Sequence, residues 1–118
     1  MNFSEAPEFS KELKKIRKLY RSINDDLIEF KKVVAVLHKR EMAHLFSSSA
    51  YAKLSISDTH TVIKARFDCA SLGNKQLLRI VVIVSNNGTS ATFIEIYAKN
   101  TKSREDSNRI RKHFKSQG

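Results

Sequence analysis

The stretch that decides the fold is residues 77–99, which read LLRIVVIVSNNGTSATFIEIYAK. Its first part, 77–85, is almost entirely apolar and rich in β-branched residues, a composition typical of a central strand. Asn86, Asn87 and Gly88 follow, and these residue types tolerate the positive φ angles of a turn. A second β-rich run covers 91–99. We therefore predict a β-hairpin over 77–99.

A further strand is predicted just before this hairpin. From Thr61 onward the hydrophobic period is two, which is typical of a half-buried strand. The alternation is between Ile63, Ala65 and Phe67 on one side and Lys64, Arg66 and Asp68 on the other. Residues 41–60 mix turn formers with scattered apolar residues. For them we expect a loop with a short helical or extended piece.

Two helices are predicted in the first forty residues. Apolar residues recur at helical spacing over 7–21, and Pro7 suits a first helical turn. The apolar stripe is Phe9, Leu13, Ile16 and Tyr20, and the other faces carry Lys11, Lys14, Lys15, Arg17, Lys18 and Arg21. A second series, Leu27, Phe30, Val34 and Leu37, marks a helix that ends at about Arg40. The short connection between them predicts a close helical hairpin.

The chain closes with a predicted helix over 102–114, which places Ile110 and Phe114 on one stripe. Its 118 residues suit one ordinary domain with its own core. We therefore predict a single domain, 1–118, of the α+β class. In it, an N-terminal helical hairpin packs on a small antiparallel sheet that is followed by a C-terminal helix.

The charge balance points to a polyanionic partner. Lys and Arg number 22 against 12 Asp and Glu, giving a net charge of +10. This exceeds what solubility requires, and nucleic acid is the partner that such an excess favours. Acidic proteins and anionic membranes attract the same charge, and a chain merely rich in solvated lysine is the alternative.

Several function classes are disfavoured. The single cysteine, Cys69, is expected to pack in the interior and fits a reducing compartment. The chain has neither an apolar run of about 20 residues nor a signal-peptide pattern, so we expect a cytoplasmic protein with no membrane association. The four histidines lack metal-ligand spacing, and no local pattern supports a Cys-His nucleophile pair. No glycine-rich phosphate loop is present, which argues against a nucleoside-triphosphate enzyme.

Side chains alternate across strands, so the polar faces of the predicted strands can be compared. In the hairpin, one face is expected to hold Leu78, Ile80, Val82, Val84, Ile94, Ile96 and Ala98, and the other Arg79, Val81, Ile83, Phe93, Glu95, Tyr97 and Lys99. If the apolar faces cover the helices, the opposite face gathers Lys64, Arg66, Arg79, Glu95, Tyr97 and Lys99, with Lys102 and Arg104 just beyond.

Such a face is suited to RNA. Its cations can hold phosphates, and Tyr97 can stack on a base. An ordinary solvated sheet face, with Lys, Arg and Glu paired across strands, is the competing interpretation. Because several neighbouring strands share the same sign of charge, we favour binding, with Lys102 and Arg104 as further RNA contacts.

Four segments carry a resemblance to a known family. They are 9–15 (FSKELKK), 62–67 (VIKARF), 78–81 (LRIV) and 93–99 (FIEIYAK). In this order they resemble the RelE/ParE toxin superfamily of bacterial toxin-antitoxin systems, over most of the chain apart from 41–60. The resemblance implies a short first strand near Asn2 to Ser4, a helical hairpin, a three-stranded antiparallel extension and a last helix.

For the RelE-like branch, the resemblance implies an endoribonuclease that enters the ribosomal A site and cuts mRNA. A cognate antitoxin wrapped around it would neutralise it. The 2′-hydroxyl of the mRNA attacks the adjacent phosphorus, so no metal or small-molecule cofactor is implied. Lys64 or Glu95 is then the candidate base, Arg66 and Arg79 hold the phosphate, and Lys99 stabilises the phosphate or the leaving group.

Many ribosome-dependent members also place a Tyr or His near the C-terminus, for which Tyr97 and His113 are the available substitutes. Two alternatives stay open. A ParE-like inhibitor of DNA gyrase would act by protein binding alone, and a non-catalytic module would bind RNA without cutting it.

Overall fold

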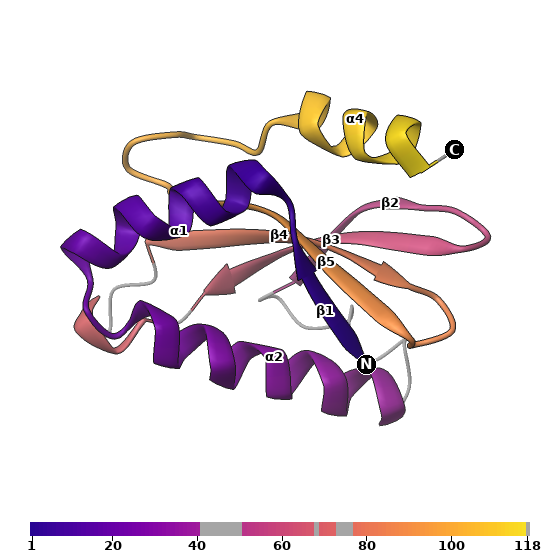
Figure 1. Cartoon of the computed structure of the whole chain (residues 1–118), viewed down its shortest axis with the longest axis horizontal. Coiled ribbons are helices and arrows are strands. Elements are labelled where there is room, and N and C mark those ends of the chain that lie inside the picture. The colour runs from indigo at the N-terminus through magenta and orange to yellow at the C-terminus, as the bar shows by residue number, and fades with distance from the viewer. Residues whose placement is uncertain (41–50, 68, 73–76, 118) are drawn as a thin grey trace.

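The structure is a computed structural model that describes residues 1–40, 51–67, 69–72 and 77–117. The described elements follow the order β1 (Asn2–Glu5), α1 (Pro7–Leu19), α2 (Ile23–Arg40), β2 (Tyr51–Ile56), β3 (His60–Phe67), the 3-10 turn η1 (Ala70–Leu72), β4 (Leu78–Ser85), β5 (Ser90–Ala98) and α4 (Ser107–Gln117). The predicted α+β class is confirmed (Figure 1).

The strands form one sheet in the order β1-β5-β4-β3-β2. Three of the strand pairs are antiparallel, namely β2–β3, β3–β4 and β4–β5. The fourth pair, β1–β5, is parallel. The short first strand implied by the resemblance is therefore present. The prediction of a purely antiparallel sheet is wrong, because β1 enters the sheet beside β5 in the same direction. The extended piece expected within 41–60 is β2, and residues 41–50 lie outside the described residues.

The predicted hairpin is confirmed as β4 and β5. Between them the chain turns at Gly88, whose φ of 78° lies in the region that favours glycine. The Ser85 hydroxyl oxygen accepts hydrogen bonds from the backbone N–H groups of Thr89 and Ser90, at 3.1 and 2.9 Å. The continuous apolar run of β4 is explained by its central place in the sheet, where both of its faces are covered.

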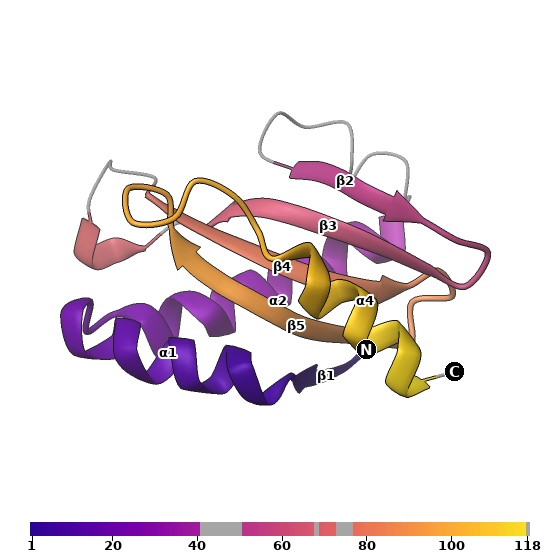
Figure 2. The same ribbon diagram turned by 90° about the horizontal axis from the view of Figure 1, so that it is seen from above.

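The larger core lies between the sheet and the helical hairpin. α2 runs along one face of the sheet, and α1 flanks β5 (Figures 1 and 2). Phe9 of α1 stacks on Phe93 of β5, with ring centroids 5.4 Å apart, and Phe30 of α2 lies between Phe93 and Phe67. The two predicted helices are thus confirmed, although α1 ends at Leu19 rather than at residue 21.

α4 lies across the opposite face of the sheet (Figures 1 and 2). Its Ile110 and Phe114 pack against a smaller buried cluster that includes Val62, Val81 and Ile94, as the stripe predicted. The helix begins at Ser107 rather than at residue 102, because Asp106 caps it. The Asp106 carboxylate accepts a hydrogen bond from the Asn108 backbone N–H at 3.0 Å.

One irregularity changes the predicted faces of β5. The register with β4 shifts between Val81, which is paired with Glu95, and Val82, which is paired with Phe93. This shift is a β-bulge, which places two consecutive side chains on one side of the strand. Phe93 consequently belongs to the larger core and Ile94 to the smaller one, the reverse of the prediction from strict alternation.

Candidate functional site

The predicted polar residues do share one face of the sheet. In the registers of β3, β4 and β5, Arg66 lies opposite Arg79, and Arg79 lies opposite Tyr97. These three residues form a row across the sheet, which we call the arginine row. Two residues away along each strand, and so on the same face, Lys64 lies opposite Val81, and Val81 lies opposite Glu95. Strand alternation alone therefore located this cluster correctly.

Two arginines stand at the centre of the candidate site. Arg66 is exposed and has no carboxylate partner among the described residues. Arg79 is half-buried, and one of its guanidinium nitrogens donates a hydrogen bond to the Leu78 carbonyl oxygen at 3.1 Å. Like charges directly opposite each other destabilise a sheet, so the charges of this pair do not favour folding.

Lys64 contacts an acid that the sequence analysis did not single out. Its Nζ donates to the Glu105 carboxylate at 2.9 Å, and the two side chains keep 28% and 15% of their surface exposed. Burial alone would raise the pKa of Glu105, but the hydrogen bond from Lys64 and further interactions bring the net pKa below its ordinary value of 4.5. Glu105 is therefore ionised at neutral pH and lies at the margin of the polar cluster.

Glu95 is not available as a base for an external substrate. Only 1% of it is exposed. Its carboxylate accepts a hydrogen bond from the Asp106 backbone N–H at 2.8 Å and an ion pair from Lys102. The prediction of Glu95 as an accessible base is therefore wrong, because the segment before α4 folds over it. Glu95 instead anchors that segment to the sheet.

Tyr97 is also covered, with 5% of its surface exposed. The Lys102 ammonium lies 5.6 Å from the centre of its ring. Burial, followed by the negative charges of Glu105 and Glu95, raises the pKa of the Tyr97 hydroxyl, and Arg79 opposes this shift. The ring cannot stack on an incoming base in this arrangement, which corrects the predicted stacking role.

The remaining predicted residues border the arginine row. Lys99 follows β5 directly, is exposed, and extends the ladder through its backbone N–H, which donates to the Leu77 carbonyl at 2.7 Å. Arg104 is exposed on the segment that crosses the sheet. Lys102 is turned toward Glu95, with 38% of its side chain exposed, so it neutralises a buried acid as well as facing solvent.

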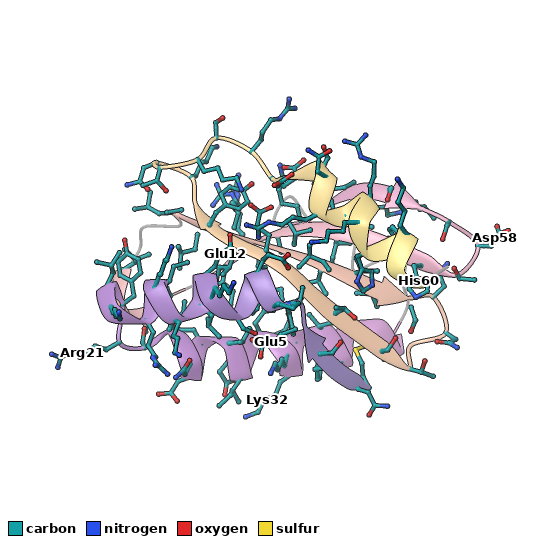
Figure 3. All side chains as sticks on the ribbon, turned by 45° about the horizontal axis from the view of Figure 1, so that its top comes forward. Glu5, Glu12, Arg21, Lys32, Asp58 and His60 are labelled. Carbon is teal, nitrogen blue, oxygen red and sulfur yellow. The ribbon has the colours of Figure 1, made fainter. Side chains whose placement is uncertain are left out.

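Ion pairs hold α4 over this face. Arg109 donates to the Glu12 carboxylate at 2.8 Å, and the same carboxylate accepts a hydrogen bond from the Ile96 backbone N–H at 3.3 Å. Glu12 extends from α1 on the side that faces α4 (Figure 3). The hydrogen bond from Arg109 to Glu12 is the largest influence on the guanidinium and raises its pKa. α4 is thereby tied to α1 as well as to the sheet.

The two substitutes for a C-terminal Tyr or His lie in different places. Tyr97 belongs to the arginine row. His113 is half-buried next to Phe114, whose ring is 6.0 Å from that of His60. His60 begins β3, six residues before Arg66, which is about 20 Å along a strand. Of the two, Tyr97 is the one that the fold brings to the arginines.

Other chemistry finds little support in the described part of the chain. No group of three or more His, Cys, Asp or Glu side chains there is arranged to hold a metal ion. Cys69 is buried against Ser22, as expected of a packing residue. None of the described helices is both long and apolar enough to cross a bilayer. Comparisons with protein-family models, curated proteins and solved structures found no significant match.

Proposed function

We propose that this chain is a RelE-like toxin, an endoribonuclease that cuts mRNA on the ribosome without a metal. The observation that carries the proposal is the arginine row, in which Arg66 and Arg79 face each other directly on one side of the sheet. Two adjacent guanidinium groups provide a fork of donors that matches a phosphodiester. The order of elements, with a first strand, a helical hairpin, antiparallel strands and a last helix, agrees with the resemblance seen in the sequence.

The chemistry assigned to the site is attack by the RNA 2′-hydroxyl on the adjacent phosphorus. A 2′-oxygen-to-phosphorus bond forms, the bond to the 5′-oxygen breaks, and the products are a 2′,3′-cyclic phosphate and a 5′-hydroxyl. Arg66 and Arg79 neutralise the charge that develops on the phosphorane oxygens. Lys99, exposed at the end of β5, assists the phosphate or the leaving oxygen.

Proton transfer falls to Lys64 and Glu105 in this scheme. Because Glu95 is enclosed, Glu105 takes its place as the acid beside Lys64, at 2.9 Å. The ionised Glu105 accepts the proton of the 2′-hydroxyl, and the Lys64 ammonium donates a proton to the leaving oxygen. Each positioned acid or base contributes about 10²–10⁴-fold to the rate of such a reaction.

The cellular part of the proposal comes from the resemblance. The protein acts in the cytoplasm, its substrate is ribosome-bound mRNA, and a cognate antitoxin protein neutralises it.

Two observations favour a different function, that of a non-catalytic RNA-binding module. Glu95 is sequestered, and Lys64 is already paired with an acid. A ParE-like gyrase inhibitor would not require the arginine row.

Induction of the protein in bacteria tests the proposal. We expect translation to stop, with mRNA cut at ribosome-occupied codons. The double variant Lys64→Ala with Arg79→Ala should abolish cutting, whereas Lys32→Ala with Arg111→Ala, which removes two cations from exposed helix positions, should retain it.

Three other outcomes would contradict the proposal. Growth arrest with intact mRNA and blocked supercoiling would indicate a gyrase inhibitor. RNA binding with no cleavage and no arrest would indicate a binding module. Equal loss of cutting in both double variants would show that general charge, rather than the arginine row, is responsible.

A further inference from the structure

In the part of the chain that the structure describes, α1 carries a group of lysines that have no acidic partner. Four exposed lysines follow the spacing i, i+3, i+4 and i+7, which places them on one side of a helix. They are Lys11, Lys14, Lys15 and Lys18, and we call them the lysine stripe. None of the four has a carboxylate partner among the described residues. By contrast, Lys64 and Lys102 on the sheet side are both paired with glutamates.

Folding does not explain the lysine stripe. The pairs Lys11–Lys15 and Lys14–Lys18 are four residues apart, and like charges at this spacing destabilise a helix. An exposed helix face that served solubility alone would gain from interspersed acids. The two acids nearest in sequence, Glu8 and Glu12, point toward α4, where they pair with Lys112 and Arg109. The positive charge on the outward face of α1 is thus uncompensated.

A shallow hollow borders the lysine stripe between α1 and the start of α2. Lys11 and Lys14 line it together with Arg17, and Ser10, Leu13 and Asn24 complete the lining. Three cations at successive turns of one helix therefore face a depression that also offers a hydroxyl and an amide. A chain of phosphates is the ligand that matches such a series of positive charges.

We propose that the lysine stripe docks on the phosphate backbone of duplex RNA. Lys11 and Lys18 are separated by about 10 Å along the helix axis, so the stripe presents a rigid row of charge over several phosphates. This surface is distinct from the arginine row, which lies on the sheet face covered by α4. The choice of RNA over DNA rests on the function proposed above, whereas the phosphate recognition itself follows from the stripe.

Two other partners fit the stripe less well. A helix that lies in a membrane surface inserts its apolar face among the lipids. In α1 that face is occupied, because Phe9 is buried and Leu13 and Ile16 pack on the larger core. Protein interfaces are centred on aromatic and aliphatic side chains and are depleted in lysine. The outward face of α1 offers four lysines and no aromatic residue.

The test is the salt dependence of binding to an RNA hairpin with about 20 base pairs, a length sufficient for shape-based contacts. The stripe variant Lys11→Gln with Lys15→Gln is compared with the control Lys32→Gln with Lys115→Gln. Both remove two exposed helical lysines and lower the net charge of +10 equally. The slope of log affinity against log salt should lose about 1.4–1.8 in the stripe variant, at about 0.7–0.9 per phosphate contact. The control should keep the wild-type slope.

Several results would overturn the proposal. One is an equal loss of slope in both variants, which would reduce the stripe to general charge. Another is equally tight, stripe-dependent binding to a DNA duplex or to vesicles of anionic phospholipid. The stripe variant leaves Arg66 and Arg79 intact, so its loss of slope reports on the lysine stripe and not on the arginine row. If the wild-type protein cuts no RNA but still shows the slope loss in the stripe variant, the proposed nuclease activity is wrong and the docking surface remains supported.

Discussion

Arg66 and Arg79 lie directly opposite each other in β3 and β4, and Tyr97 continues the row in β5. Like charges directly opposite each other destabilise a sheet, and we propose that this pair serves to bind an anion. This arrangement also predicts that folding stability and function change in opposite directions, although in most substitutions they fall together. A substitution of the exposed Arg66 is expected to improve folding while it weakens function.

The first prediction concerns the opposite effects of an Arg66 substitution on stability and on function. Arg66→Gln should raise the free energy of unfolding by about 0.2–1 kcal/mol, because it removes a like-charge pair across two strands. The same variant should bind and cut RNA less well. Urea unfolding and a cleavage assay measure the two effects. Arg111→Gln, on the exposed side of α4, should change neither. Lower stability of Arg66→Gln would mean that the arginine has a folding role.

The second prediction concerns the buried glutamate of β5. Glu95→Gln keeps an oxygen that can accept the hydrogen bond from the Asp106 backbone N–H, so the segment before α4 should stay docked and RNA cleavage should persist. Glu95→Ala leaves that N–H without its partner, and the variant should lose about 1–3 kcal/mol of stability. Urea unfolding, together with amide exchange across α4, distinguishes the two variants. Abolished cleavage in a fully folded Glu95→Gln protein would restore Glu95 as the base.

The third prediction concerns the pair formed by Lys64 and Glu105. The pKa of Glu105 is lowered in the folded state, so the unfolded state takes up a proton first as the pH falls below 4.5. The stabilising contribution of Glu105 is therefore complete above that pH and is lost as the pH falls through the folded pKa. Urea unfolding on both sides of pH 4.5 should show a steeper acid loss in the wild type than in Glu105→Gln.

Activity gives an independent check on the same residue. If Glu105 accepts the proton of the 2′-hydroxyl, Glu105→Gln should cut RNA about 10²–10⁴-fold more slowly at neutral pH while it still binds RNA. Glu29→Gln, which changes an exposed acid on α2, serves as the control. Unchanged cleavage in Glu105→Gln would restrict the pair to holding the segment before α4.

Much of this architecture could be predicted from the sequence, because local patterns determine it. Strand alternation put Lys64, Arg66 and Arg79 on one face, and the tertiary register brought the two arginines together as expected. Alternation failed at Phe93 and Ile94, because a bulge inserts a residue into the period and nothing in the local sequence marks it.

The segment that lies over this face of the sheet, residues 102–106, could not be predicted in the same way. The burial of Glu95 depends on the path of residues 102–106, which read as the start of a helix but instead cross the sheet and supply Lys102 and the Asp106 N–H. The same error concealed Glu105, since a residue assigned to a solvated helix face gives no reason to expect a contact with Lys64. Acids placed among the basic residues of 102–106 were the available signal.

The last prediction concerns the far end of α4. Burial, and then the electrostatic interaction with His60, lowers the pKa of His113 below its ordinary value of 6.5. The unfolded state therefore binds the proton more readily, and stability falls as the pH drops from about 6.5 toward the folded pKa. Because His113 neighbours Phe114, which packs on the smaller core, this loss should begin with the release of α4.

His113→Gln tests the coupling, since the variant cannot gain charge at this position. Its urea-unfolding free energy should change less than that of the wild type between pH 7 and pH 5.5, values chosen to bracket the ordinary histidine pKa of about 6.5. His60→Gln should reduce the pH dependence partially, because it removes the electrostatic interaction with His60 and leaves the burial of His113. An identical pH dependence in wild type and His113→Gln would show that protonation of His113 does not govern the docking of α4. In that event the ion pairs of Arg109 and Lys112 with α1 would hold α4 regardless of pH in this range.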